Sequence, residues 1–241
     1  MRRRLLRHHL PLALVSAIVL LVFMTLPAFD VHRFPRVDLT SGSYPSELHG
    51  SGTIRAKSFL GVSTRGFTAA TGYLATGFLA LTLLLGPANL VLRRRNPVSS
   101  YLRRDVGVWA AIFSAVHVLY GLQVHARLAK FATYFAASDG TPLTNAFGIA
   151  NWTGLAALVV VVSLLALSSD VVLGRLGARS WKRLQRFNYA LFALVLVHAI
   201  FYGVFLRASS PYTALLLVGT AAVLVGQAIG ILLYRRRILR R

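Results

Sequence analysis

Two histidines stand in the middle of long apolar segments of the sequence. His117 lies in VGVWAAIFSAVHVLYGLQVHARL and His198 lies in RFNYALFALVLVHAIFYGVFL. An ionisable side chain at such a position is costly in a membrane helix, and it usually marks a functional site. Each histidine follows the start of its apolar segment by 11 residues, counted from Val106 and from Phe187, which is about 16 Å along a helix. We therefore expect the two imidazoles to lie at the same depth.

A facing pair of neutral imidazoles suits the two axial positions of a haem iron. A zinc site would need a third and a fourth ligand, and the sequence offers none at this depth. Gly121, one turn after His117 on the same face, would leave room for the edge of a porphyrin ring. The alternative is that each histidine only forms a hydrogen bond between helices. Together the two residues favour one haem held by His117 and His198.

A third histidine of the same segment, His125, is predicted near the outer membrane surface. It follows His117 by eight residues and stands beside Arg127 and Lys130, about 12 Å further along the helix. It is either an ordinary interfacial histidine or a contact for a haem propionate, an outer electron acceptor or a second cofactor.

The opposite end of both segments carries four arginines: Arg103, Arg104, Arg183 and Arg186. They either orient the protein and contact lipid, or attract an acidic electron donor or a haem propionate, with Arg104 as a candidate cofactor contact. A second haem at this end would need histidines 13 or 14 residues before the central pair. The chain has Arg103, Arg104, Leu184 and Gln185 there, so we expect a single haem.

The whole chain has the composition of a multi-pass membrane protein. Of its 241 residues 56% are hydrophobic and 14% are charged, with a mean hydropathy of +0.64, whereas a soluble domain has about 25% charged residues. The formal net charge of +21 comes largely from short basic clusters beside the apolar segments. It therefore indicates cytoplasmic loops and contact with anionic lipids, and no nucleic acid binding. The absence of cysteine excludes disulfides, iron–sulfur clusters and thiolate chemistry.

Hydropathy predicts an all-α bundle of six transmembrane helices. The expected spans are residues 10–29, 67–92, 106–128, 148–168, 187–206 and 212–234. With the N-terminus inside, the inner segments hold 19 of the 27 basic residues, so both termini are predicted in the cytoplasm and the protein in the inner (plasma) membrane. The first segment has a basic start but no clear cleavage site, which favours an uncleaved helix over a signal peptide.

Two regions are expected along the chain. Residues 1–66 comprise the first transmembrane helix and a long extracytoplasmic loop rich in Gly, Ser and Pro, and residues 67–241 comprise the haem-binding helix bundle. The segment SSDVVLGRLGARSWKRLQRF mixes apolar and basic residues, as an interfacial helix does. The sequence contains no phosphate-binding loop and no dinucleotide fingerprint, so we expect no NAD(P) or flavin domain within it.

Three motifs resemble the ferric reductase-like transmembrane domain family: TGYLATGFLALTLLLGP (71–87), YLRRDVGVWAAIFSAVH (101–117) and SWKRLQRFNYALFALVLVH (180–198). The branch that they resemble most is MsrQ (YedZ), the haem-binding membrane subunit of a periplasmic methionine sulfoxide reductase system. This resemblance implies heme b, a b-type haem ligated by His117 and His198, in a subunit that relays single electrons across the membrane. That branch usually has a further histidine where this chain has Gln185, which again implies one haem.

The same resemblance implies the redox partners. Electrons would come from membrane quinol or from a cytoplasmic flavin reductase, and would go to an extracytoplasmic partner, a molybdopterin-containing reductase; a quinone or FMN is a further cofactor candidate. One alternative is a metalloreductase that reduces ferric or cupric ions directly, with His125, Lys130, His32 and His49 near the outer acceptor. The other is a non-redox assembly or transport protein, which the lack of acidic residues inside the spans disfavours.

Overall fold

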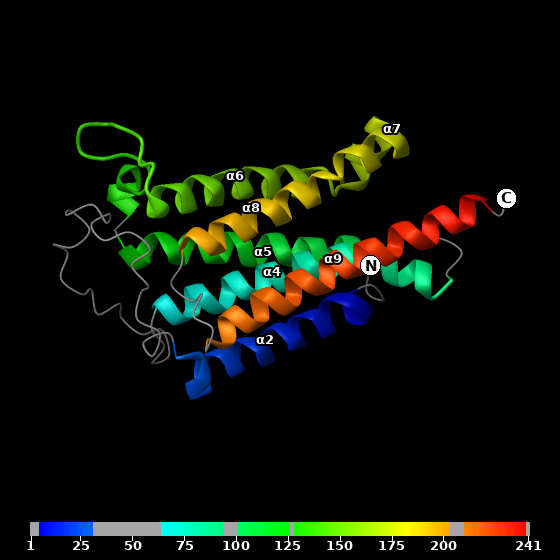
Figure 1. Ribbon diagram of the computed structural model, residues 1–241, viewed down its shortest axis with the longest axis horizontal. Helices are drawn as coiled ribbons and strands as arrows, with labels where there is room; N and C mark the ends of the chain where they lie inside the picture. The colour runs from blue at the N-terminus through cyan, green and yellow to red at the C-terminus, as the bar shows by residue number, and fades with distance from the viewer. Residues whose placement is uncertain (1–4, 31–63, 94–100, 126–127, 203–209, 240–241) are drawn as a thin grey trace.

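A computed structural model describes residues 5–30, 64–93, 101–125, 128–202 and 210–239. Over these ranges the chain is almost wholly helical, and the helices lie lengthwise beside one another (Figure 1). Six segments are long and apolar enough to cross a membrane: Leu6–Thr25, Thr64–Val91, Tyr101–Gln123, Ala146–Ala166, Arg179–Tyr202 and Pro211–Arg237. The predicted all-α membrane bundle with six spans is confirmed, while the cytoplasmic placement of its termini stays a prediction.

The helices of the spans are α2 (Leu10–Thr25), α4 (Thr64–Val91), α5 (Tyr101–His125), α6 (Ala146–Ala166), α8 (Phe187–Tyr202) and α9 (Pro211–Leu239). Shorter elements are the π-helix η1 (Leu5–His9), the 3-10 helices η2 (Pro27–Phe29) and η4 (Leu128–Tyr134), and the helix α7 (Asp170–Leu184). Helix α4 packs against α5, α9 and α2, and α6 packs mainly against α8 and also touches α5. The α4–α5 pair and the α6–α8 pair are therefore the two halves between which a site can form.

The two helices that carry the central histidines are parallel. Helix α2 begins and α9 ends at one end of the bundle, close to α7, and we call this the terminal end (Figure 1). Helices α4 and α6 begin at the opposite end, which we call the far end. Helices α5 and α8 both run from the terminal end to the far end, which is the common direction that the sequence prediction of equal depth for His117 and His198 requires.

The outer surface of the bundle is strongly apolar. Inside, Leu83 and Val106 are 1% and 0% exposed, whereas Leu217 and Val218 on α9 are 63% and 68% exposed. A soluble monomer rarely exposes contiguous apolar surface on this scale. Lipid tails cover such a surface without cost, so the exposed aliphatic side chains agree with the six spans.

The predicted interfacial segment forms a helix of its own, α7. The side chain of Ser169 caps it by accepting a hydrogen bond from the Val172 N–H at 3.2 Å. Gly177 has a φ of +71°, a left-handed conformation that glycine adopts without steric cost, and the helix is kinked there. The indole N–H of Trp181 donates to the carbonyl of Leu167 at 2.7 Å, which attaches the last turns of α7 to the end of α6.

Candidate cofactor site

His117 of α5 and His198 of α8 face each other inside the bundle. Their ring centres are 6.1 Å apart, and their planes are nearly perpendicular, at 87°. Both side chains line one cavity. The structure therefore brings together the two histidines that the sequence placed at the same depth.

Each imidazole is held by a backbone carbonyl of a neighbouring helix. Nδ1 of His117 lies 2.9 Å from the carbonyl oxygen of Thr68 on α4, and Nδ1 of His198 lies 2.7 Å from that of Ala150 on α6. A carbonyl oxygen only accepts hydrogen bonds, so Nδ1 carries the proton and donates it in both rings. The lone pair is consequently on Nε2. Histidines that bind a metal through Nε2 have this same tautomer.

Both rings also rest against a glycine. A Cβ atom added to Gly72 would lie 2.8 Å from Nδ1 and 2.9 Å from Cε1 of His117. A Cβ atom added to Gly154 would lie 2.8 Å and 3.0 Å from the same two atoms of His198. Each glycine follows the carbonyl that its histidine contacts by four residues, one turn of the same helix.

The cavity around the two rings has a volume of about 280 Å³, just below the usual range for small-molecule sites. Its walls come mainly from α4, α5, α6, α8 and η4, and its polar lining includes Arg65, Ser114, Asn151 and Tyr202. Among the described residues, none of its walls adds a Cys, Asp, Glu or third His. The site thus offers two imidazole nitrogens in an otherwise mostly apolar space.

Of the other candidate site residues from the sequence, some line the cavity and others do not. Gly121 lines the cavity, and its place beside the edge of a porphyrin ring stays a prediction. His125 is the last residue of α5, and its side chain lies outside the described part of the structure. Arg104 stands 13 residues before His117 on α5, about 20 Å towards the terminal end, and is not among the lining residues. The geometry therefore gathers Gly121 but not Arg104 with the histidine pair.

Arg65 lines the cavity, whereas the sequence predicts it in the extracytoplasmic loop before the second span. Helix α4 begins at Thr64, three residues before the predicted start of the span at residue 67, so that Arg65 lies in its first turn. The charge of Arg65 lowers the local hydropathy, and hydropathy alone therefore starts the helix too late. The signal in the sequence that could have identified Arg65 as part of the helix is a single basic residue directly before an apolar segment.

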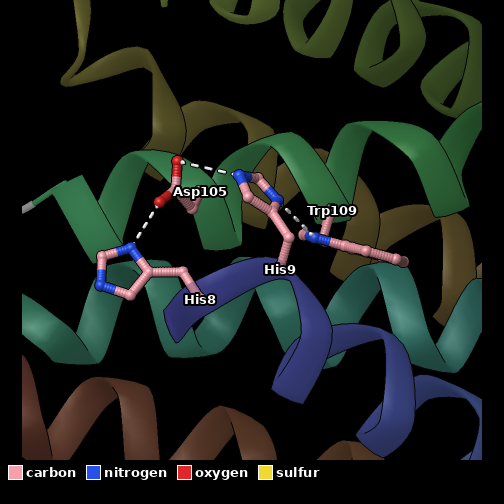
Figure 2. A network of polar contacts seen from close by, with 4 residues as sticks. All are labelled: His8, His9, Asp105 and Trp109. Carbon is pink, nitrogen blue, oxygen red and sulfur yellow. Dashed lines mark hydrogen bonds and ion pairs between the residues drawn. The ribbon is translucent and has the colours of Figure 1, made fainter. Parts of the chain in front are cut away.

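A second polar group lies at the terminal end, and we call it the terminal polar cluster (Figure 2). Asp105 of α5 is 1% exposed, and its Oδ2 lies 2.6 Å from Nδ1 of His8, which donates to it. Nε2 of His9 lies 3.7 Å from Oδ1 of the same carboxylate, and the indole N–H of Trp109 donates to Nδ1 of His9 at 3.2 Å. His8 and His9 have no sequence-predicted role, because 97 residues separate His8 from its partner.

Comparison with known proteins indicates the family of the chain. Residues 71–196, slightly more than half of the chain, match the family described as ferric reductase like transmembrane component. The chain belongs to the ferric reductase-like transmembrane family. It is accordingly a multi-pass membrane protein, and its family indicates a membrane redox component. The matched range includes Gly72, His117 and Gly154 and ends two residues before His198.

A relative among curated proteins is an uncharacterized protein of Treponema pallidum (strain Nichols). It is 34% identical over 101 residues, which are 42% of this chain and 26% of that protein. The similarity thus spans about a quarter of the length of the relative.

Proposed function

We propose that the chain is a membrane cytochrome b that binds one haem between His117 and His198 and relays single electrons across the membrane. The observation that carries this proposal is the separation of the two rings. If both Nε2 atoms lay on the line between the rings, a metal–imidazole bond of about 2.0 Å on each side and about 1.1 Å from each nitrogen to its ring centre would give roughly 6.2 Å between ring centres. The observed separation is 6.1 Å.

The protonation of the two rings supports the same assignment. Because Nδ1 of each histidine donates to a carbonyl, Nε2 of each ring is free to bind iron, and the hydrogen bond makes the imidazole a stronger ligand. Bound haem supplies a one-electron change between ferric and ferrous iron. If His117 and His198 both bound the iron, the protein would leave no open position for a substrate, and such a site would suit a relay.

The motifs at 101–117 and 180–198 support a place in the MsrQ branch of the family. On that assignment the protein lies in the inner membrane with its termini in the cytoplasm. It accepts electrons from quinol or a flavin reductase and passes them to an extracytoplasmic molybdopterin-containing reductase. Position 185, where the branch usually has histidine, holds a glutamine whose Oε1 accepts from the Asn188 amide at 3.2 Å. One haem is therefore proposed.

Visible spectroscopy of the detergent-purified protein tests the proposal. The wild type should show the bands of low-spin haem b in a reduced-minus-oxidised spectrum, and His117→Ala and His198→Ala should each lose them. His125→Ala is the matched control, because it removes a histidine from the same helix, and it should keep the spectrum. A colourless wild type, or haem lost in His125→Ala and kept in His198→Ala, would contradict the ligand assignment.

A second measurement separates a relay from a metalloreductase. The reduced protein is mixed with soluble ferric or cupric chelates, and reoxidation of the haem is followed by stopped-flow absorbance. A dedicated relay should be reoxidised slowly by such chelates and quickly by its protein partner. Rapid reoxidation by the chelates alone would instead assign direct metal reduction.

A further inference from the structure

The two halves of the site repeat one local arrangement. On α4 the carbonyl of Thr68 contacts His117, and Gly72 lies one turn further along the same helix. On α6 the carbonyl of Ala150 contacts His198, and Gly154 again lies one turn further. In both cases the carbonyl fixes one edge of the imidazole while the glycine supports its Nδ1–Cε1 side.

We propose that Gly72 and Gly154, each acting with the carbonyl one turn before it, are positioning residues that hold the imidazole planes of His117 and His198 perpendicular to each other. This inference rests on the proposed haem ligation. It adds that each ring is prevented from turning about its own Cβ–Cγ bond, so the 87° between the planes is retained when the ligands bind iron.

The contacts show why these positions require glycine. The three atoms nearest to a Cβ at Gly72 are all atoms of the His117 ring, the closest at 2.8 Å, and the same holds for Gly154 and His198. Real Cβ atoms do not approach ring atoms so closely. An added methyl group must therefore push the ring away, which either breaks the Nδ1 hydrogen bond or turns the plane.

A different reading is that the glycines only let the helices pack closely, since small residues are common where membrane helices meet. Close packing would place backbone or aliphatic atoms of the neighbouring helix nearest to the missing Cβ. Such contacts occur elsewhere in the bundle, where a Cβ at Gly226 would meet the side chain of Leu84. At Gly72 and Gly154 the nearest atoms belong to the imidazoles, so the two glycines act on the rings.

The angle between the planes has a measurable electronic consequence. In low-spin ferric haem, parallel imidazole planes split the iron d orbitals and give a rhombic electron paramagnetic resonance (EPR) spectrum with three resolved g values. Perpendicular planes leave two of these orbitals close in energy, and the spectrum then has one isolated, very large g value. The 87° angle predicts the second kind of spectrum.

EPR of the oxidised, full-length protein in detergent tests the inference, with Gly72→Ala, Gly154→Ala and Gly77→Ala as variants. Gly77 is the matched control, because it lies on the same helix as Gly72 and a Cβ there meets nothing within 4 Å. The wild type and Gly77→Ala should show the large isolated g value. Gly72→Ala and Gly154→Ala should lose it, either by a change to a rhombic or high-spin spectrum or by loss of haem with helix content by circular dichroism unchanged.

Each result has a distinct meaning. A rhombic spectrum of the wild type would overturn the inference without any variant, and so would Gly72→Ala and Gly154→Ala proteins whose spectra equal that of the wild type. If a glycine variant does not fold, the wild-type spectrum still decides whether the planes are perpendicular. A wild-type protein that binds no haem would refute the proposed function instead.

Discussion

Removing the carboxylate of Asp105 should detach the first helix from the bundle. Asp105 is 1% exposed and accepts a 2.6 Å hydrogen bond from His8, while His9 approaches its other oxygen at 3.7 Å. A hydrogen bond to a charged group contributes about 1.5–3 kcal/mol, and a buried polar group left without its partner costs about 1–3 kcal/mol more. His8 is 19% exposed, so water compensates part of this loss, and we expect Asp105→Ala to lower the free energy of unfolding by about 2–4 kcal/mol.

The assay is unfolding in mixed micelles with increasing denaturing detergent, followed by circular dichroism. Proteolysis of the N-terminal segment under native conditions should rise in parallel, because the cluster joins the start of α2 to α5. Asp105→Asn keeps an acceptor oxygen for His8 and should cost clearly less. A free energy of unfolding for Asp105→Ala within about 0.5 kcal/mol of the wild type, the scatter of ordinary surface substitutions, would show that the Asp105 cluster does not hold the first helix.

Three further predictions concern the cavity and the connections. Arg65→Leu should weaken haem retention during heating, measured by loss of the haem absorbance. The reason is that Arg65 lines the cavity and can pair with the propionate carboxylates of a haem. Unchanged retention would exclude that contact. Hydrogen bonds from the hydroxyl and N–H of Thr141 hold the pKa of the Asp139 carboxyl below its usual value. These bonds therefore stabilise the turn above the ordinary carboxylate pKa and are lost as pH falls through the lowered pKa. Hydrogen exchange of the Thr141 amide, measured by mass spectrometry and corrected for the intrinsic pH dependence, should therefore become faster only in acid. Equally fast corrected exchange at neutral pH would contradict this prediction. Ser169→Ala removes the cap that accepts from Val172 and should destabilise the start of α7 by about 1 kcal/mol, seen as faster hydrogen exchange there with α6 as the internal reference.

The sequence sufficed for the six spans and for the pair of histidines, and the reason is physical. A transmembrane span can be recognised from its length and hydropathy alone. All six expected segments correspond to apolar helices in the structure. The equal depth of His117 and His198 followed from counting residues along two parallel helices, and their ring centres do lie 6.1 Å apart.

Contacts between helices that are far apart in the sequence could not be predicted. The supporting glycines, Gly72 and Gly154, act on rings carried by other helices, and no periodicity within one helix shows which neighbour it faces. Asp105 lies just outside the expected span 106–128, yet the structure includes it in the apolar segment Tyr101–Gln123, so the expectation of no acidic residue within the spans was wrong. It is almost fully buried there and accepts a hydrogen bond from His8 of η1. Such pairings depend on how the helices pack, and the packing partners of a helix cannot be derived from a single sequence.

The cavity lies closer to one end of the bundle, and this gives the two electron-transfer steps different electrical character. His117 stands 16 residues after the start of α5 and 8 before its end, so about 24 Å of helix separates it from the terminal end and about 12 Å from the far end. Moving one charge across a whole membrane held at 100 mV changes its energy by about 2.3 kcal/mol. On the proposed function, an electron that arrives from the terminal end crosses about two thirds of that voltage before it reaches the haem, or roughly 1.5 kcal/mol. Membrane voltage would therefore act mainly on the reduction of the haem, while its reoxidation at the far end would depend more on the partner that docks there.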